Sequence, residues 1–218
     1  MTAPTILAFD TSGAYCSTAL LRGGEICAAR YEEMQRGQAE RLMPLLEETL
    51  AEAGVDWAAL DRIAVGTGPG NFTGTRIAVS AARGLALGLE VPAIGVSLLD
   101  ALAVGSGGPV LACLSAPRGR AYVQGHRMRE AVPARLITLD QVAAGWAEPG
   151  LTCIGSAAQE IAARLGASVA PAAFAPAAAI ARNAAARDPD AETRPAPLYV
   201  RPADAAPPSD PPPVILDA

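Results

Sequence analysis

Glycines crowd residues 66–76, which read GTGPGNFTGTR and directly precede a long apolar run. A glycine-rich turn that opens a helix can bind a phosphate group, because its free N–H groups and the helix dipole favour an anion. The known signatures do not match: a P-loop needs a lysine, which this sequence lacks, and the third glycine of G-x-G-x-x-G falls on Thr73. The pattern favours a strand-to-helix turn in which glycines allow positive φ and close backbone approach. We expect this turn to consist of Gly68, Pro69, Gly70, Asn71, Phe72 and Thr73.

Few other residues are spaced for catalysis. All 17 basic residues are arginines, which excludes a Walker lysine, a Schiff-base lysine and a pyridoxal anchor. His126 is the single histidine, so a two-histidine metal site cannot form within the sequence, and a surface or edge-strand position is expected for it. The adjacent pairs Glu32–Glu33 and Glu47–Glu48 point to different sides of their elements and make no carboxylate pair. We therefore expect no catalytic residue, no metal site and no cofactor held by this chain alone.

Composition narrows the class of protein. The 218 residues can form one large domain or two small ones, and although 51% are apolar, no run approaches the roughly 18 to 20 residues of a membrane span. The net charge of −5 argues against a broad nucleic-acid-binding face. The four cysteines form no C-x-x-C pair, and the first residues lack the basic region of a signal peptide. We expect a cytoplasmic protein that does not bind membranes.

The first half of the sequence predicts alternating strands and helices. Apolar runs indicate strands at 5–12, 14–21, 25–33, 61–68 and 91–96, and helical spacing indicates helices at 38–53, 74–88 and about 97–104. Gly23-Gly24 between two runs is a hairpin signal. Three hairpin-linked strands followed by α-β-α-β-α predict an α/β fold with a mixed sheet flanked by helices. This order is that of the ribonuclease-H-like and actin-like ATPase halves, an analogy at the level of fold.

The second half begins at a cluster of glycine and proline, GSGGP at residues 105–109. We expect it to divide the chain into subdomains 1–104 and 105–218. A strand pair is predicted at 110–115 and 120–128, and capping-box spacing predicts helices at 138–145 and 156–166. Residues 167–193 are alanine-rich without clear periodicity, and the proline-rich residues 201–218 are expected to be extended.

The helix at 74–88 is apolar almost all the way round, so most of its surface must be buried. Two interpretations remain open: a core helix covered by its own neighbours, or a helix that packs against a partner. A partner helix could approach along the small residues Gly74, Ala78, Ala82 and Ala86, with Arg76 and Arg83 at the rim. The helix at 38–53 would contribute Leu42, Leu45, Leu46 and Thr49.

Several segments resemble one known family. GPGNFTGTR at 68–76 is similar to the GPGSFTGLR signature of the TsaB family, with Asn71 for Ser and Thr75 for Leu. ILAFDTS, ERLMPLLEETL, VPAIGVSLLDALA and PLYVRPADA also resemble that family, in the right order along nearly the whole chain. Where many members have DARR, this chain has Ser115-Ala116-Pro117-Arg118.

The resemblance implies an actin-like fold of two subdomains and a non-catalytic role. TsaB proteins belong to the machinery that makes threonylcarbamoyladenosine in tRNAs reading codons that begin with A. In it, TsaD carries the catalytic metal and transfers the threonylcarbamoyl group, and TsaE supplies an ATPase. The resemblance implies pairing with TsaD through helices of the N-terminal half, and a homodimer when the chain is alone. tRNA and ATP would be bound only in the assembled complex.

The alternative functions are enzymatic. An actin-like ATPase or kinase would hold phosphate and metal at Asp10, Thr11 and Ser12, but only Gly13 remains of the glycine pattern of those enzymes. A capped turn is the favoured interpretation of these residues. The single histidine argues against a metallopeptidase.

Overall fold

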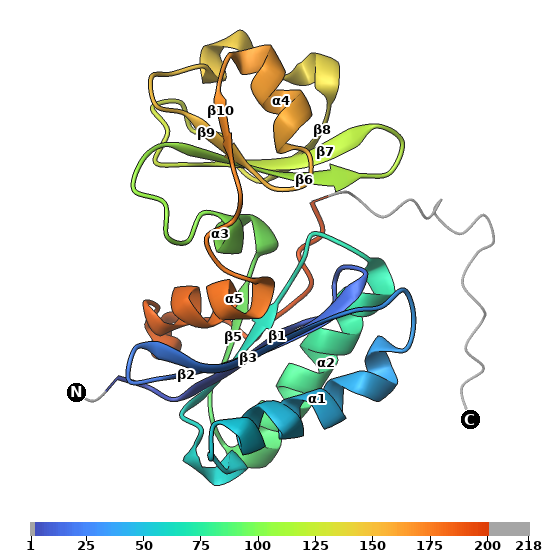
Figure 1. Ribbon diagram of the computed structural model, residues 1–218, viewed down its shortest axis with the longest axis vertical. Helices are drawn as coiled ribbons and strands as arrows, with labels where there is room; N and C mark the ends of the chain where they lie inside the picture. Colours follow the sequence, from blue (N-terminus) through green and yellow to red (C-terminus); the bar gives the residue numbers. More distant parts are fainter. Residues whose placement is uncertain (1–2, 201–218) are drawn as a thin grey trace, which may run out of the picture.

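A computed structural model of the chain describes residues 3–200, which form two units, each built around a five-stranded sheet (Figure 1). The first sheet has the order β3-β2-β1-β4-β5, with antiparallel pairing of β1, β2 and β3 and parallel pairing of β1, β4 and β5. The predicted order of three strands and then α-β-α-β-α is confirmed. The elements are β1 (Ile6–Asp10), β2 (Tyr15–Arg22), β3 (Glu25–Glu33), α1 (Gln38–Glu52), β4 (Arg62–Gly66), α2 (Phe72–Leu89), β5 (Ala93–Val96) and α3 (Leu98–Leu102).

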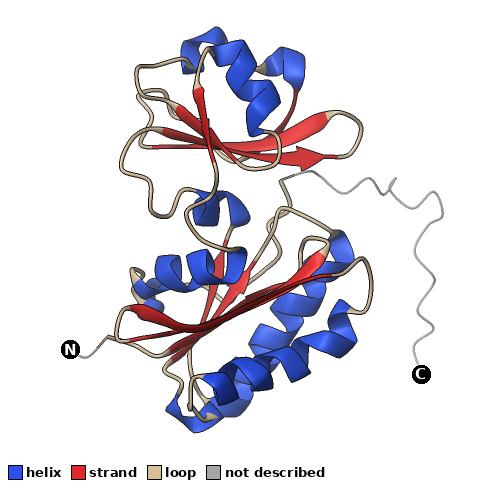
Figure 2. Cartoon of the chain, in the orientation of Figure 1, coloured by secondary structure: helices blue, strands red, loops and turns tan. Residues whose placement is uncertain are grey.

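Helices cover both faces of the first sheet. α1 and α2 lie side by side on one face, and α5 (Pro176–Ala185) lies on the other (Figures 1 and 2). All five residues of β1 are buried as a consequence, which explains why its sequence is a continuous apolar run and does not alternate.

The second sheet has the order β10-β9-β6-β7-β8, with α4 packed on it. Antiparallel pairing joins β6, β7 and β8, and parallel pairing joins β6, β9 and β10. The pair predicted at 110–115 and 120–128 is therefore confirmed, and three short strands are added to it. The elements are β6 (Val110–Ala116), β7 (Arg120–His126), β8 (Arg135–Thr138), β9 (Thr152–Ile154), α4 (Ala158–Leu165) and β10 (Ser168–Ala170).

The helix predicted at 138–145 is wrong. The chain instead forms two single 3₁₀ turns, Leu139–Gln141 and Ala144–Trp146. The capping pair exists, because Gln141 Oε1 accepts a hydrogen bond of 2.9 Å from Thr138 N, but it fixes only one turn. The indole of Trp146 is then buried in the second core, and this packing stabilises the irregular path.

The helix predicted at 156–166 exists but begins later, at Ala158. Ser156 does not cap it: its hydroxyl oxygen accepts a hydrogen bond of 2.8 Å from Ser115 N on the neighbouring strand. The helix ends at Gly166, as predicted, with φ of 62°.

The expected subdomain 105–218 does not form one structural unit, because part of it packs on the first sheet. α5 returns to the first sheet, where Ala177, Ala181 and Ala184 are fully buried and Ala177 N donates to Ser17 Oγ at 3.3 Å. Small side chains let the helix lie close to β1 and β2. Alanine fills most of α5, and only Arg182 and Asn183 are polar, so few side chains mark its exposed face in the sequence.

Residues beyond 200, including the predicted extended tail at 201–218, lie outside the described residues. Within residues 3–200, no helix has the length and apolar character needed to cross a membrane.

Candidate functional site

The glycine-rich turn packs against the turn between β1 and β2. Asn71 N donates a hydrogen bond of 2.6 Å to the carbonyl oxygen of Ser12, and Thr11 Oγ1 donates one of 2.8 Å to the carbonyl oxygen of Gly74. A Cβ atom at Gly70 or Gly74 would collide with the backbone of Ser12 or Thr11. The glycines therefore allow two backbones to touch, as the sequence predicted, and Gly68 adds a φ of 83°.

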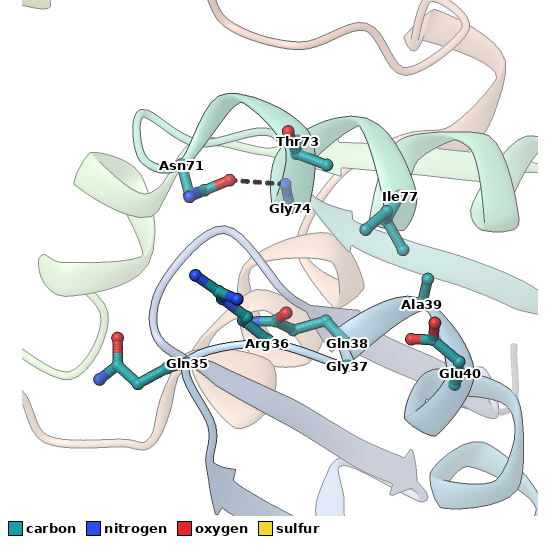
Figure 3. A pocket seen from close by; sticks show the side chains of 10 residues that line it. All are labelled: Gln35, Arg36, Gly37, Gln38, Ala39, Glu40, Asn71, Thr73, Gly74 and Ile77. Atoms are coloured by element: carbon teal, nitrogen blue, oxygen red, sulfur yellow. Dashed lines mark hydrogen bonds between the residues drawn. The ribbon is translucent and has the colours of Figure 1, made fainter.

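The first turn of α2 is capped by the chain itself. Asn71 is the N-cap residue, and its Oδ1 accepts a hydrogen bond of 2.9 Å from Gly74 N (Figure 3). The hydroxyl of Thr75 donates to the carbonyl oxygen of Asn71 at 2.8 Å. A backbone N–H group that could bind a phosphate is thus already occupied by a side chain.

Asp10 is fully buried beside this turn and is bound by its own neighbours. Its Oδ2 accepts hydrogen bonds from the hydroxyl of Tyr15 at 2.6 Å and from that of Ser12 at 2.9 Å. A Cβ at Gly66 would collide with its other oxygen. Burial raises the pKa of the Asp10 carboxyl, and the two hydroxyl hydrogen bonds act in the opposite direction. The capped turn expected for residues 10–12 is what the structure contains.

Within residues 3–200, no group of three or more His, Cys, Asp or Glu side chains could hold a metal ion. His126 lies at the end of β7, where it pairs with Val110, and it is partly buried. This differs from the surface or edge-strand position expected, because β7 lies between β6 and β8 in the sheet. Desolvation lowers the pKa of its imidazole.

A cleft with a volume of about 730 Å³ opens between the two units. The first unit contributes Tyr15 and Phe72 to its walls, and the second contributes Tyr122, Ser115 and Pro117. Hydroxyl and carboxamide groups supply the polar part of the lining. None of the described side chains that line the cleft carries a charge. It is therefore poorly suited to a polyphosphate, which needs cations or free N–H groups.

The residues predicted to contact a partner are mostly inside the molecule, so that prediction is corrected. Seven of the predicted residues are buried, and they face the first sheet or the adjoining turn: Leu42, Leu45, Leu46, Thr49, Gly74, Ala78 and Ala82. Ala86 is partly buried against the same core. Small residues allow close approach to a sheet as well as to a helix, and here the first interpretation, a core stripe, is the correct one.

Arg76 and Arg83 bind a segment of this chain that returns from α5. Arg83 Nε donates to the carbonyl oxygen of Pro195 at 2.7 Å, and Arg76 Nε donates to the hydroxyl of Tyr199 at 3.1 Å. Leu198 N donates to the carbonyl oxygen of Thr67 at 2.8 Å. We call residues 188–200 the strap. Sequence reasoning missed it, although PLYVRPADA, one of the family-like segments, covers its last residues.

The surface that α1 and α2 leave exposed is a different stripe of the same helices. On α2 it contains Ser80, Gly84 and Leu87, and Leu87 is 80% exposed. On α1 it contains Met43, which is 39% exposed. A Cβ at Gly84 would meet nothing within 4 Å. We call these four residues the outer face.

A groove of about 300 Å³ separates the N-terminal ends of α1 and α2 (Figure 3). The segment from Gln35 to Glu40 forms one side, and Asn71, Thr73, Gly74 and Ile77 form the other. Arg36 and Glu40 give it charges of both signs.

Comparisons with known proteins agree on one family. The family described as "TsaD: tRNA N6-adenosine threonylcarbamoyltransferase" matches residues 31–188. The chain is 39% identical to "tRNA threonylcarbamoyladenosine biosynthesis protein TsaB" of Escherichia coli over 122 residues, which are 54% of this chain and 52% of the relative. It is 43% identical to the protein of the same name in Haemophilus influenzae over 99 residues, 45% of this chain and 42% of the relative. The matches thus span about half the length of these curated relatives.

Solved structures match over more of the chain. The chain is similar to "YeaZ from Pseudomonas aeruginosa", with a TM-score of 0.69 and 32% identity over 83% of this chain and 90% of that one. A second Pseudomonas aeruginosa structure, described as similar to peptidase YEAZ, gives a TM-score of 0.74 and 29% identity. The match covers 91% of this chain and 100% of that one. Component A of (R)-2-hydroxyglutaryl-CoA dehydratase from Acidaminococcus fermentans shares only the fold, with a TM-score of 0.51 and 12% identity. The match covers 84% of this chain and 100% of that one. The expected actin-like α/β fold is confirmed.

Proposed function

This chain belongs to the TsaB/YeaZ family, and on that premise we propose that it is a non-catalytic subunit in the biosynthesis of threonylcarbamoyladenosine in tRNA. It acts by binding a TsaD-type subunit, which transfers the threonylcarbamoyl group to the adenosine next to the anticodon. TsaE joins through that complex, and the work takes place in the cytoplasm. The names of the relatives support the pathway, and the geometry of the site supports a non-catalytic role for this chain.

One observation carries the non-catalytic role: the hydrogen bond from Tyr15 to Asp10. An actin-like ATPase needs a carboxylate at this position that can reach phosphate or metal. Here both neighbouring hydroxyls and the burial of Asp10 keep its carboxylate within the protein. The uncharged cleft and the capped start of α2 agree with this assignment. They argue against the alternative, an ATPase or kinase with its own nucleotide site.

The partner binds across the outer face of α1 and α2. Leu87 offers a large apolar side chain, and Met43 offers an adaptable one. Ser80 and Gly84 are small and exposed, so they leave room for a partner helix to approach the α2 backbone. In the absence of TsaD, a second copy of this chain occupies the same face, so the homodimer and the heterodimer compete.

The proposal is tested by reconstitution with TsaD and TsaE from the same organism. We expect threonylcarbamoyl transfer to tRNA only when all components are present, and no ATP hydrolysis or transfer by this chain alone. Omission of this chain should abolish or strongly reduce transfer. Turnover by the chain alone that persists through repurification and is lost in Asp10→Asn would refute the proposal.

A further inference from the structure

The cleft between the two units has the size and lining of a binding site without charge. Its volume of about 730 Å³ lies within the range of roughly 300–1,000 Å³ that is usual for ligand sites. Aromatic rings of Tyr15, Phe72 and Tyr122 contribute to its walls. Asn71 uses its oxygen to cap α2, which leaves its amide nitrogen as a donor. Such a lining suits an apolar segment whose backbone carbonyls accept hydrogen bonds.

The strap brings the chain to the rim of this cleft. Leu198 is held to Thr67 by a backbone hydrogen bond of 2.8 Å. The ring of Tyr199 lies 6.0 Å, centroid to centroid, from that of Phe72, which lines the cleft. The guanidinium group of Arg76 lies 3.7 Å from the centroid of the Phe72 ring and donates to the Tyr199 hydroxyl. Residues after Val200 therefore start beside the cleft.

The sequence that follows contains an uncharged, proline-rich segment, which suits the uncharged, aromatic lining of the cleft. Residues 201–218 read RPADAAPPSDPPPVILDA, and residues 211–216 form an uncharged stretch of three prolines followed by Val, Ile and Leu. Consecutive prolines favour the polyproline II conformation, which aromatic-lined grooves recognise at a low entropic cost. A polyproline II segment makes no internal hydrogen bonds, so its carbonyl oxygens can accept hydrogen bonds from donors in a groove.

The length of this segment is sufficient. Pro211 follows Val200 by eleven residues. A flexible chain of that length spans about 18 Å on average, and an extended one about 34 Å. Either distance allows a segment that starts at the rim to enter the cleft. A tether this short gives an effective concentration on the order of millimolar.

We propose that residues 211–216 of this chain bind in its own cleft, between the aromatic residues of the two units. The occupant is thus a segment of the same molecule, selected by neutral, proline-rich chemistry. The inference is independent of the proposed function, because it concerns the cleft and not the outer face. It gives the cleft a role that requires no nucleotide.

Amide NMR spectra test this proposal on the full chain and on a chain that ends at Ala205. We expect the signals of cleft residues, Ser115 and Tyr122 among them, to shift on truncation, while Trp146 in the second core stays unchanged. The triple variant P211S/P212S/P213S should reproduce the shifts. The matched control P207S/P208S, in the same segment but outside 211–216, should not.

Three results would overturn the proposal. The first is identical cleft signals in the full and truncated chains. The second is shifts confined to the outer face. The third is shifts that vanish on dilution, which would assign the binding to a second copy. A synthetic peptide of residues 206–218 gives a further check, because at concentrations on the order of millimolar it should restore the cleft signals of the truncated chain. It should fail to do so in Tyr122→Ala.

Discussion

Thr11 and Gly74 are joined by a hydrogen bond of 2.8 Å from the Thr11 hydroxyl to the Gly74 carbonyl oxygen. The two residues are 63 positions apart in the sequence, and they fasten the turn after β1 to the first turn of α2. Their backbones touch, because Gly74 has no side chain and the space for a Cβ is filled by the Thr11 carbonyl group. The glycine-rich turn therefore serves the assembly of the fold.

Gly74→Ala should destabilise the chain by at least about 1–3 kcal/mol, since the added methyl group collides with backbone that cannot move aside. Gly84→Ala in the same helix is the matched control, because its Cβ meets nothing. That change should stabilise the helix by up to roughly 1 kcal/mol. Urea denaturation measures both effects. Equal effects of the two substitutions would contradict this account of the turn.

The buried Asp10 predicts a pH dependence of stability. Burial raises its native pKa above the ordinary value of 3.8, so its contribution is fully present below that value and is lost as the pH rises through the native pKa. Asp10→Asn cannot ionise. Its urea midpoint relative to the unsubstituted chain should therefore increase as the pH rises from 3.8 and level off above the native pKa of Asp10. A midpoint difference that stays constant or decreases over this range would show that the carboxylate is stabilised in its charged form.

The hydrogen bond from Arg83 to the strap leads to a prediction about the local stability of the strap. This charged hydrogen bond to Pro195 is partly exposed, so we expect it to contribute about 1 kcal/mol of local stability. Loss of this bond should raise the equilibrium constant for opening of the strap roughly fivefold. Amide hydrogen exchange at Leu198 should become faster by that factor in Arg83→Ala. Arg164→Ala is the control, because Arg164 bonds only within α4. Unchanged exchange at Leu198 would mean that other contacts hold the strap.

The net charge of −5 predicts weak binding of tRNA by this chain alone. Filter binding at physiological salt should give no saturation in the nanomolar range. Nanomolar binding with a steep salt dependence would contradict this prediction. Stronger binding by the complete complex would agree with it.

Sequence patterns were sufficient for the helices and strands of residues 5–104 and for the role of the glycine-rich turn. The apolar runs and helical spacing at residues 5–104 depend on neighbours in sequence, and the missing lysine excluded a P-loop. The strap could not be predicted in this way, because Arg83 and Pro195 are 112 positions apart. The stripe from Gly74 to Ala86 shows a second limit. Small residues permit close packing against either a sheet or a helix, and the pattern alone does not distinguish the two.

This correction changes which variants are informative. Ala82 is fully buried against the first sheet, so Ala82→Arg should disrupt the fold itself. Circular dichroism of that variant should show loss of structure. A folded Ala82→Arg chain would mean that the stripe faces solvent after all.

The most direct test of the proposed partner role is the affinity of Gly84→Arg for TsaD from the same organism, measured by calorimetry. An arginine there has room in the free chain but would place a bulky charge within the outer face. Overpacking alone costs about 1–3 kcal/mol and a buried charge several more, so affinity should fall at least about a hundredfold. Ala163→Arg, exposed on α4 of the second unit, should bind like the unsubstituted chain. Binding of TsaD by folded Gly84→Arg with unchanged affinity would contradict the account.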